Sequence, residues 1–162
     1  MMKNEVNEVV DKYAKTLYRI AYINLKSKSD AEDIVQDVFL KYLLNKKPFA
    51  DENHRRNWLI RITLNLCSNL RKSAWKRKVI PLDVDSLIDF ETEEQNRIFY
   101  DLDLLPEKYK VVVQLHYFED LSIETISNIL GISESNVKVR LHRAREMLKE
   151  DLEKGEISYG KI

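Results

Sequence analysis

Cysteine, glycine and proline are scarce in this sequence of 162 residues. Cys67 is the single cysteine, which rules out a disulfide within the chain and is typical of a reducing compartment. Three glycines and three prolines are too few for a sheet of tight hairpins, so the composition favours helices. Since 44% of the residues are hydrophobic, we expect a buried core rather than a disordered chain.

The sequence also lacks long apolar runs and the spacing of metal or phosphate sites. No run reaches the roughly 18 apolar residues of a transmembrane helix, and the N-terminus has no apolar stretch of signal-peptide length. We therefore expect a cytoplasmic protein that does not insert into a membrane. His54, His116 and His142 show no metal-ligand spacing, and no glycine-rich phosphate loop is present. We expect no metal, no cofactor and no enzymatic activity.

An excess of charge of one sign is absent overall but present locally. The net charge is zero, yet residues 1–82 hold 17 basic and 9 acidic side chains, a net of +8. Residues 83–103 hold 1 basic and 8 acidic side chains, a net of −7, and residues 104–162 carry a net of −1. Such segregation produces patches of opposite sign, which steer charged partners whatever the total charge is.

Apolar residues at helical spacing predict three helices in the first half of the chain: about 5–26, 30–44 and 55–77. Asp30 is expected to cap the second helix, and residues 45–54 to form a polar loop before the third. In the third helix, residues three or four apart predict one apolar face: Leu59, Ile62, Leu66 and Leu70.

The second half begins with an acidic segment, residues 81–95, that has few apolar residues and is predicted to be a flexible linker. Helical spacing returns and continues to about residue 153, with breaks expected at Pro106, Asp120 and Gly131. Residues 154–162 are expected to be a frayed tail. The predicted fold class is therefore all-α: two small helical domains, 1–80 and 96–153, joined by a flexible acidic linker.

The most specific local pattern is a helix-turn-helix over residues 121–141. Ser122 is suited to cap a first helix, Gly131 to adopt a positive φ at the turn, and Ser133 to cap a second helix. The second helix is expected to bury Val137, Leu141, Ala144 and Leu148, and its other side carries cations: Lys138, Arg140, His142, Arg143 and Arg145. A helix of this kind suits the major groove of duplex DNA.

Two simpler interpretations of this segment remain open at this point. The segment could be a plain helical hairpin whose basic face is only solvated, although the turn glycine, the cap and the apolar residue Ile132 occur in register. His142 could equally be an ordinary surface histidine.

A second basic stretch lies in the first half. Residues 54–78 contain eight Lys or Arg and no acid, with Trp58 and Trp75 and three asparagines interleaved. Cations, aromatic rings and amides together suit single-stranded or melted nucleic acid, whose bases are free to stack and hydrogen bond. The alternative is a solvated basic face on a core helix, with Trp58 in the core.

Two blocks of residues resemble the sigma-70 family of bacterial RNA polymerase subunits. The segments DAEDIVQDVFL (30–40) and WLIRITLN (58–65) resemble its region 2, and LPEKY (105–109) and VKVRLHRAR (137–145) resemble its region 4. The resemblance covers about residues 8–152, and no region 3 separates the blocks. This arrangement resembles the extracytoplasmic function (ECF, group 4) subfamily, which directs core polymerase to promoters.

The resemblance implies a role for each basic or polar surface. The expected contacts with core polymerase, on the β′ clamp helices, are Asp33, Gln36 and Asp37. The resemblance places the −10 element against the loop 45–54 and the following helix, with Asn65 beside a flipped-out base and further contacts from Arg55, Arg56, Arg61, Asn69, Arg71 and Lys72. The −35 element would be bound by Lys138, Val139, Arg140, His142 and Arg143.

The same resemblance implies partners: core RNA polymerase through its β′ and β subunits, promoter DNA, and an anti-sigma factor. The acidic linker would follow positively charged surfaces of polymerase, although a soluble disordered tether explains its composition equally well. Ile60 stands where many relatives have an aromatic residue, and Val139 and His142 replace commoner choices. Stacking at position 60 and the base preference of the reading helix therefore do not follow from the resemblance.

Two other functions compete with this hypothesis. A stand-alone helix-turn-helix regulator would bind duplex DNA without polymerase, usually as a dimer on a palindrome. An adaptor protein that uses the acidic segment would not depend on the basic faces at all.

Overall fold

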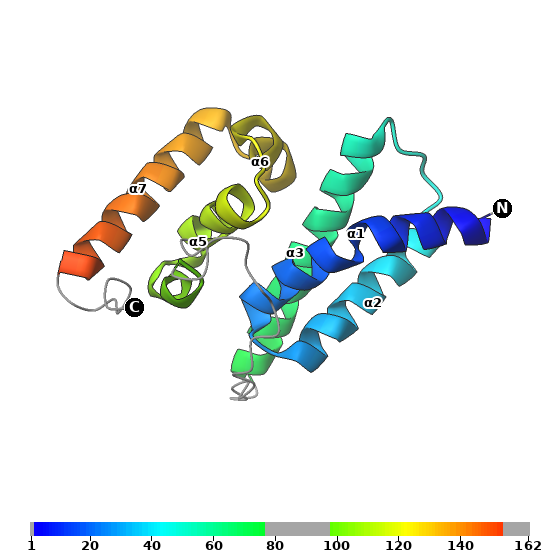
Figure 1. The fold of residues 1–162 in the computed structure, drawn as a ribbon, viewed down its shortest axis with the longest axis horizontal. Coiled ribbons are helices and arrows are strands. Elements are labelled where there is room, and N and C mark those ends of the chain that lie inside the picture. The colour runs from blue at the N-terminus through cyan, green and yellow to red at the C-terminus, as the bar shows by residue number, and fades with distance from the viewer. Residues whose placement is uncertain (1, 77–97, 154–162) are drawn as a thin grey trace. The chain divides into compact units, whose positions relative to one another are not determined.

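The computed structural model describes residues 2–76 and 98–153, and every regular element in those ranges is a helix (Figure 1). The predicted all-α fold is confirmed. The chain divides into two compact units, Met1–Ile88 and Asp89–Ile162, and each is described by itself. The predicted linker at 81–95 and the predicted tail at 154–162 lie outside the described residues.

The described part of the first unit, residues 2–76, contains three helices: α1 (Met2–Leu25), α2 (Lys28–Leu44) and α3 (Glu52–Lys76). Helix α1 packs against both α2 and α3, as Figure 1 shows in the blue, cyan and green part of the chain. Four apolar side chains between the helices are fully buried, at 0% exposure: Leu17, Ile20, Val38 and Leu59. Full burial of such a side chain contributes about 1.5–3 kcal/mol, so this shared core holds the three helices together.

Two helix starts differ from the predictions. Asp30 is not the N-cap of α2; Ser27 is, and its Oγ accepts the Asp30 N–H at 3.3 Å. Asp30 lies instead in the first turn, where its charge complements the positive end of the helix dipole. Helix α3 begins at Glu52, three residues before the predicted start, because Asp51 Oδ1 accepts the His54 N–H at 2.8 Å.

The buried face of α3 is rotated from the predicted one. Leu59 is buried as expected, but Ile62, Leu66 and Leu70 are only half-buried. Their place in the core is taken by Ile60, Thr63 and Cys67. Thr63 can be fully buried because its hydroxyl donates to the Leu59 carbonyl at 2.8 Å, which satisfies the polar group within the helix.

The second unit contains a short 3-10 helix η1 (Leu102–Leu104), α5 (Glu107–Val113), a π-helical turn η2 (Gln114–Phe118), α6 (Ile123–Leu130) and α7 (Glu134–Glu153). Pro106 is the N-cap of α5, and the predicted breaks at Asp120 and Gly131 are confirmed by their positive φ angles of 54° and 68°. Helix α7 packs against both α5 and α6. The π-helical turn was not predicted.

Candidate nucleic-acid interface

The turn between α6 and α7 has the geometry that the sequence predicts. Ser122 Oγ accepts the Thr125 N–H at 3.1 Å and caps α6, and Gly131 ends it in the left-handed region. Ser133 Oγ accepts the Asn136 N–H at 3.1 Å at the start of α7. Ser127, on α6, donates to the Ile132 carbonyl and fixes the turn from inside. These local bonds set the direction in which α7 leaves the turn.

Helix α7 has one buried side and one charged side. Val137, Leu141 and Ala144 are buried and Leu148 is half-buried, so the predicted apolar stripe is largely confirmed. On the opposite side, Lys138, Val139, His142, Arg143 and Arg145 are exposed, and Arg140 is half-buried. The predicted −35 residues therefore share one exposed surface, with Val139 as its apolar member at 45% exposure.

Several cations of this surface are oriented by hydrogen bonds or an ion pair within the second unit. Arg143 donates to the hydroxyl of Tyr109, and this bond holds the pKa of Tyr109 below its ordinary value. Arg145 Nε donates to the hydroxyl of Tyr117 at 3.3 Å, and Arg140 Nε donates to Asn136 Oδ1 at 3.1 Å. Sequence reasoning missed the tyrosines, which lie on α5 and η2 rather than on the helix they support.

On the same α7 surface, His142 Nε2 lies 2.6 Å from Glu146 Oε1, one turn along the helix. Glu146 adds a negative charge to an otherwise basic surface. Both side chains are well exposed, so this contact is open to exchange with other charged groups.

Helix α3 presents a polar face in the first unit. Arg61, Asn65 and Asn69 are spaced by four residues and are all exposed, and Lys72 is exposed near them on the helix. Helical spacing therefore places these side chains on one side of α3. Cations and amides on one side of a helix suit contact with phosphates and with the edges of unpaired bases.

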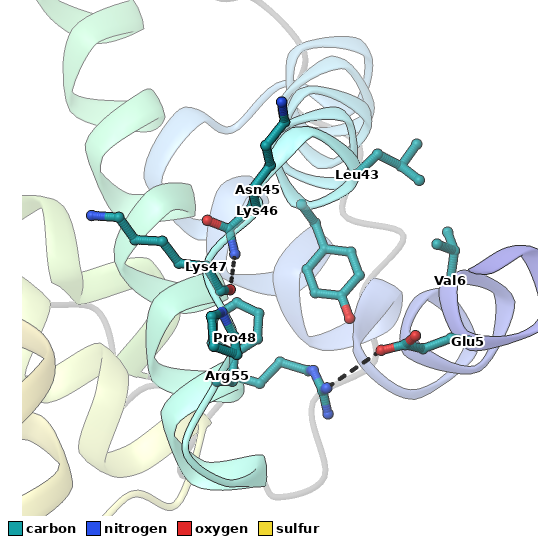
Figure 2. A pocket seen from close by; sticks show the side chains of 10 residues that line it. Glu5, Val6, Leu43, Asn45, Lys46, Lys47, Pro48 and Arg55 are labelled. Carbon is teal, nitrogen blue, oxygen red and sulfur yellow. Dashed lines mark hydrogen bonds and ion pairs between the residues drawn. The ribbon is translucent and has the colours of Figure 1, made fainter. Parts of the chain in front are cut away.

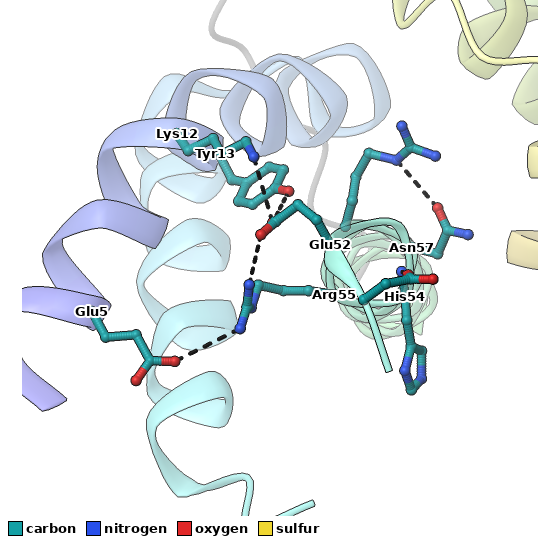
Figure 3. A network of polar contacts seen from close by, with 9 residues as sticks. Glu5, Lys12, Tyr13, Glu52, His54, Arg55 and Asn57 are labelled. Carbon is teal, nitrogen blue, oxygen red and sulfur yellow. Dashed lines mark hydrogen bonds and ion pairs between the residues drawn. The ribbon is translucent and has the colours of Figure 1, made fainter. Parts of the chain in front are cut away.

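Three other predicted −10 residues are held within the first unit. Arg71 Nη1 donates to Asn24 Oδ1 at 2.8 Å, and Arg56 Nε donates to Asn57 Oδ1 at 3.3 Å. Arg55 has two acidic partners, Glu52 at 2.7 Å and Glu5 at 3.7 Å (Figure 3). Arg55 thus pairs with acidic side chains from both α1 and α3.

The loop between α2 and α3 is built around an aromatic cluster. The ring of Phe49 lies 6.0 Å from Tyr42, 5.6 Å from Trp58 and 5.3 Å from His54, measured between centroids. Trp58 is half-buried, and its ring contacts both Phe49 and Tyr42 in this cluster. Ile60 is buried at 1% exposure, so it is not available to stack on a base.

A pocket of about 400 Å³ opens beside this loop (Figure 2). Residues from α1, α2, the loop and α3 line it: Glu5, Val6, Tyr42, Leu43, Asn45, Lys46, Lys47, Pro48, Phe49 and Arg55. Its lining combines aromatic and cationic side chains, so the surface around the loop is both apolar and basic.

Helix α2 carries a mixed exposed surface. Asp33, Gln36 and Asp37, the predicted polymerase contacts, are all exposed. Helical spacing places Leu40, Leu43 and Leu44 along the same side, and these leucines are 54%, 55% and 77% exposed. Sequence reasoning missed these leucines, although the helical spacing from Asp33 to Leu44 could have found them. Adjacent exposed leucines are typical of a surface that a protein partner covers.

Three further features bear on the chemistry of the described residues: the thiol, metal-ligating groups and apolar helices. Burial raises the pKa of the Cys67 thiol to about 12, so it is not a reactive thiolate. Residues 2–76 and 98–153 contain no group of three or more metal-ligating side chains. None of the helices in those ranges combines the length and the hydropathy needed to cross a membrane.

Comparison with known proteins gives matches in both units. The family model for sigma-70 region 2 matches residues 9–77, and that for sigma-70 region 4 matches residues 102–148. RNA polymerase sigma factor SigV of Bacillus subtilis (strain 168) is 30% identical over 152 residues, covering 90% of each chain. ECF RNA polymerase sigma factor SigW of the same organism is 30% identical over 167 residues, covering 90% of this chain and 87% of SigW.

Solved structures show the same fold. The sigma factor RpoE from Bartonella quintana, in complex with the anti-sigma factor NepR, aligns with a TM-score of 0.73 at 20% identity, covering 92% of this chain and 97% of RpoE. CnrH, in complex with the cytosolic domain of CnrY, aligns with a TM-score of 0.67 at 24% identity, covering 93% and 89%. With both regions matched in order and relatives of 30% identity along nearly the whole chain, the chain belongs to the sigma-70 family and is an ECF RNA polymerase sigma factor.

Proposed function

We propose that the two domains share promoter recognition: residues 1–80 bind core polymerase and the melted −10 element, and residues 96–153 bind the −35 element as duplex DNA. The observation that carries this proposal is the exposed surface of α7. Its cations lie opposite a buried apolar stripe, on a helix that begins at a capped turn. The protein itself catalyses no step; it positions polymerase and stabilises opened DNA.

Within the −35 surface, Lys138, Val139, His142 and Arg143 are proposed to enter the major groove, with Arg140 beside them. Arg143 can form bidentate hydrogen bonds with a guanine edge or hold a phosphate. Tyr109 supports this role because its hydroxyl fixes the guanidinium before DNA arrives.

For the −10 element, Asn65 is proposed to bind a flipped base, and the cations around it to hold the backbone of the unpaired strand. Extruding a base loses a few kcal/mol of stacking and pairing, which new contacts must recover. The exposure of Arg61, Asn65, Asn69 and Lys72 on one side of α3 supports this assignment. Arg56 and Arg71 are proposed as flanking phosphate contacts.

For polymerase, Asp33, Gln36 and Asp37 are proposed to contact the β′ clamp helices, with Leu40 and its two neighbouring leucines as the apolar part of the same interface. A mixed surface of this kind is typical of a partner interface with an apolar centre and a polar rim. Contact with the β subunit is proposed on family grounds.

An anti-sigma factor is a further proposed partner. RpoE of Bartonella quintana and CnrH, which share this fold, were both solved with a bound partner, NepR and the cytosolic domain of CnrY. We expect such a factor to compete with polymerase for this chain.

The decisive experiment is run-off transcription with sigma-free core polymerase on a randomised promoter library. The proposal predicts defined start sites that appear only when this protein is added. A parallel footprint without polymerase tests the stand-alone regulator: tight, specific protection of a palindrome by the protein alone would contradict the proposal.

Replacing Arg140 and Arg143 with alanine tests the α7 surface on a promoter selected in that library. Each lost base contact lowers affinity by about 1–3 kcal/mol, and each lost phosphate contact reduces the salt slope by about one. We expect at least a tenfold loss of promoter binding at fixed salt. Lys149→Ala, which removes an exposed cation beyond the reading positions of α7, is the matched control. Equal losses in both variants would argue against specific reading by α7.

A further inference from the structure

The loop at residues 45–51 has no helix or strand of its own, so side-chain contacts must fix its shape. Asn45 Nδ2 donates to the Lys47 carbonyl at 2.8 Å, and the Ala50 N–H donates to His54 Nδ1 at 3.0 Å. The Phe49 ring anchors the middle of the loop through its contacts with Tyr42 and Trp58. The position of Phe49 therefore sets the position of the loop.

Arg55 supports that anchor from α3. Its guanidinium carbon lies 5.4 Å from the centroid of the Phe49 ring, within the range of a cation–π contact. Arg55 also donates a hydrogen bond to the hydroxyl of Tyr42, the ring stacked beside Phe49. Its side chain is only 22% exposed, so most of its surface faces the protein.

Two carboxylates hold the guanidinium in place. Arg55 Nη1 lies 2.7 Å from Glu52 Oε1, and Nη2 lies 3.7 Å from Glu5 Oε1 (Figure 3). Glu52 is itself fixed by α1: its Oε2 accepts a hydrogen bond from the Tyr13 hydroxyl and lies 3.7 Å from Lys12 Nζ. The Tyr13 hydrogen bond holds the pKa of Glu52 below its ordinary value, which keeps the carboxylate charged.

A continuous set of contacts thus runs from Tyr13 through Glu52 and Arg55 to Phe49. We propose that Tyr13, Glu52 and Arg55 are positioning residues for −10 recognition, which hold the loop 45–51 in the shape that the unpaired strand requires. This inference rests on the proposed function of the loop. None of the three side chains has to touch DNA to affect which strand is bound.

The two carboxylates distinguish Arg55 from Arg61 on the same helix. A phosphate that approached Arg55 would meet the charges of Glu52 and Glu5, which pair with its two terminal nitrogens and would repel the phosphate. Arg61, by contrast, is exposed on the polar side of the helix. Arg55 therefore acts through Phe49 and the loop, and Arg61 is placed to act on the backbone of the strand.

Glu52→Gln tests the inference through the sign of its effect. The substitution removes a negative charge near bound DNA, so by electrostatics alone it should strengthen binding. If Glu52 holds Arg55 and the loop, the substitution should instead weaken binding to the −10 strand. Loss of one charge-assisted bond corresponds to at least about a tenfold loss of affinity.

Binding is measured with holoenzyme and a fluorescent single strand that carries the non-template −10 segment of the promoter selected with the wild-type protein. Glu8→Gln is the matched control, because Glu8 is an exposed acid on α1 outside the network. Arg55→Lys is the second variant: lysine keeps the charge but not the planar fork, so a positioning role is lost while a phosphate contact would survive. Tyr13→Phe removes a single hydroxyl group and should give a smaller loss in the same direction.

Amide hydrogen exchange of the free protein supplies a readout that does not depend on DNA. The Ala50 N–H donates a hydrogen bond to His54, and its exchange should be faster in Glu52→Gln and in Arg55→Lys. The exchange rate should not change in Glu8→Gln. Equal or tighter binding by Glu52→Gln would overturn the inference, as would weaker binding with unchanged exchange at Ala50. Failure of the proposed function would look different: the wild-type holoenzyme itself would not bind the −10 strand.

Discussion

Gly131 gives the sharpest test of the turn that directs α7. Its φ of 68° and ψ of 33° place it in the left-handed region, which residues with a Cβ adopt only at a cost in free energy. A Cβ built at this position would meet no heavy atom within 4 Å. Gly131→Ala therefore isolates the backbone term, because no steric clash is added to it.

The magnitude follows from two opposing terms. The left-handed conformation costs alanine roughly 1–2 kcal/mol relative to the right-handed one. Alanine also reduces the conformational freedom of the unfolded chain, which stabilises the folded state by about 0.4–1 kcal/mol. We expect a net destabilisation of about 1 kcal/mol for Gly131→Ala. Gly131→Asn should cost less, since asparagine tolerates the left-handed region, and it serves as the matched control.

Urea unfolding of the full chain measures this effect. Both tryptophans, Trp58 and Trp75, belong to the first unit, so their fluorescence follows that unit, whereas far-UV circular dichroism follows the helices of both. With a slope of about 1–2 kcal/mol per molar urea, the transition of the second unit should move down by about 0.5–1 M. The tryptophan transition should stay where it is.

Two results would refute this reasoning. No change with Gly131→Ala would mean that the turn does not need the left-handed conformation. A loss above about 3 kcal/mol would mean that the Cβ meets an obstacle or that the turn rearranges α7. An equal shift of the tryptophan signal would show that the two units unfold together.

Three further predictions concern the site. Asn65→Ala should impair promoter opening about tenfold because a base contact is lost, while binding to the duplex −35 element is retained. Permanganate footprinting measures the opening. Normal opening by this variant would show that Asn65 does not bind the flipped base. Val139 is expected to contact a thymine methyl in the major groove, so replacing that thymine by uracil should weaken promoter binding about threefold to fourfold. The Val139→Ala variant should bind the thymine and uracil promoters equally. The same preference for thymine in both proteins would exclude the contact. Because the pKa of Glu52 is lowered in the folded protein, its carboxylate stabilises the fold at pH values above 4.5, the ordinary pKa. This stabilisation is lost as the pH falls through the pKa of the folded state, so acid titration of Glu52→Gln should lack this part of the transition. Identical acid titration curves for the two proteins would show that the network adds no stability.

Local chemistry explains why the helix-turn-helix could be predicted from the sequence. Ser122 and Ser133 cap their helices through bonds to residues three positions away, and Gly131 meets its conformational requirement alone. Such features depend on neighbours in the sequence and need no knowledge of the fold. The same rule failed at Asp30 because two capping residues competed within four positions, and the extended backbone of Ser27 made it the cap.

The buried face of α3 was predicted less well because hydrophobicity alone defined it. Thr63 counts as polar in a hydrophobic pattern, yet it is fully buried once its hydroxyl bonds to its own helix. Ile60 and Cys67 are buried with it, so the face turns away from Ile62 and Leu66. The pattern gave the existence of an amphipathic helix but not its rotation, which the packing of α1 and α2 decides.

The contacts that organise the candidate site lay beyond the reach of the pattern for a different reason. Tyr13 and Glu52 are 39 residues apart, and Tyr117 and Arg145 are 28 apart, so only the fold brings each pair together. Spacing on α7 and α3 placed several cations and amides on polar faces, and Arg61, Asn65 and Arg143 are indeed exposed, whereas Arg140 is half-buried. It could not separate Arg55, held by two acids, from Arg61 on the open face.

This difference bears on how the chain recognises a promoter. A long arginine side chain loses roughly 1.5–2 kcal/mol of rotamer freedom when it is fixed. Arg143 and Arg145 each donate a hydrogen bond to a tyrosine hydroxyl within the unit without DNA. Part of the loss of rotamer freedom therefore occurs on folding rather than on binding DNA. Lys138 has no comparable fixed planar group and is exposed. We therefore infer that Arg143 enters the major groove with its planar group already oriented, whereas Lys138 must be ordered when DNA binds.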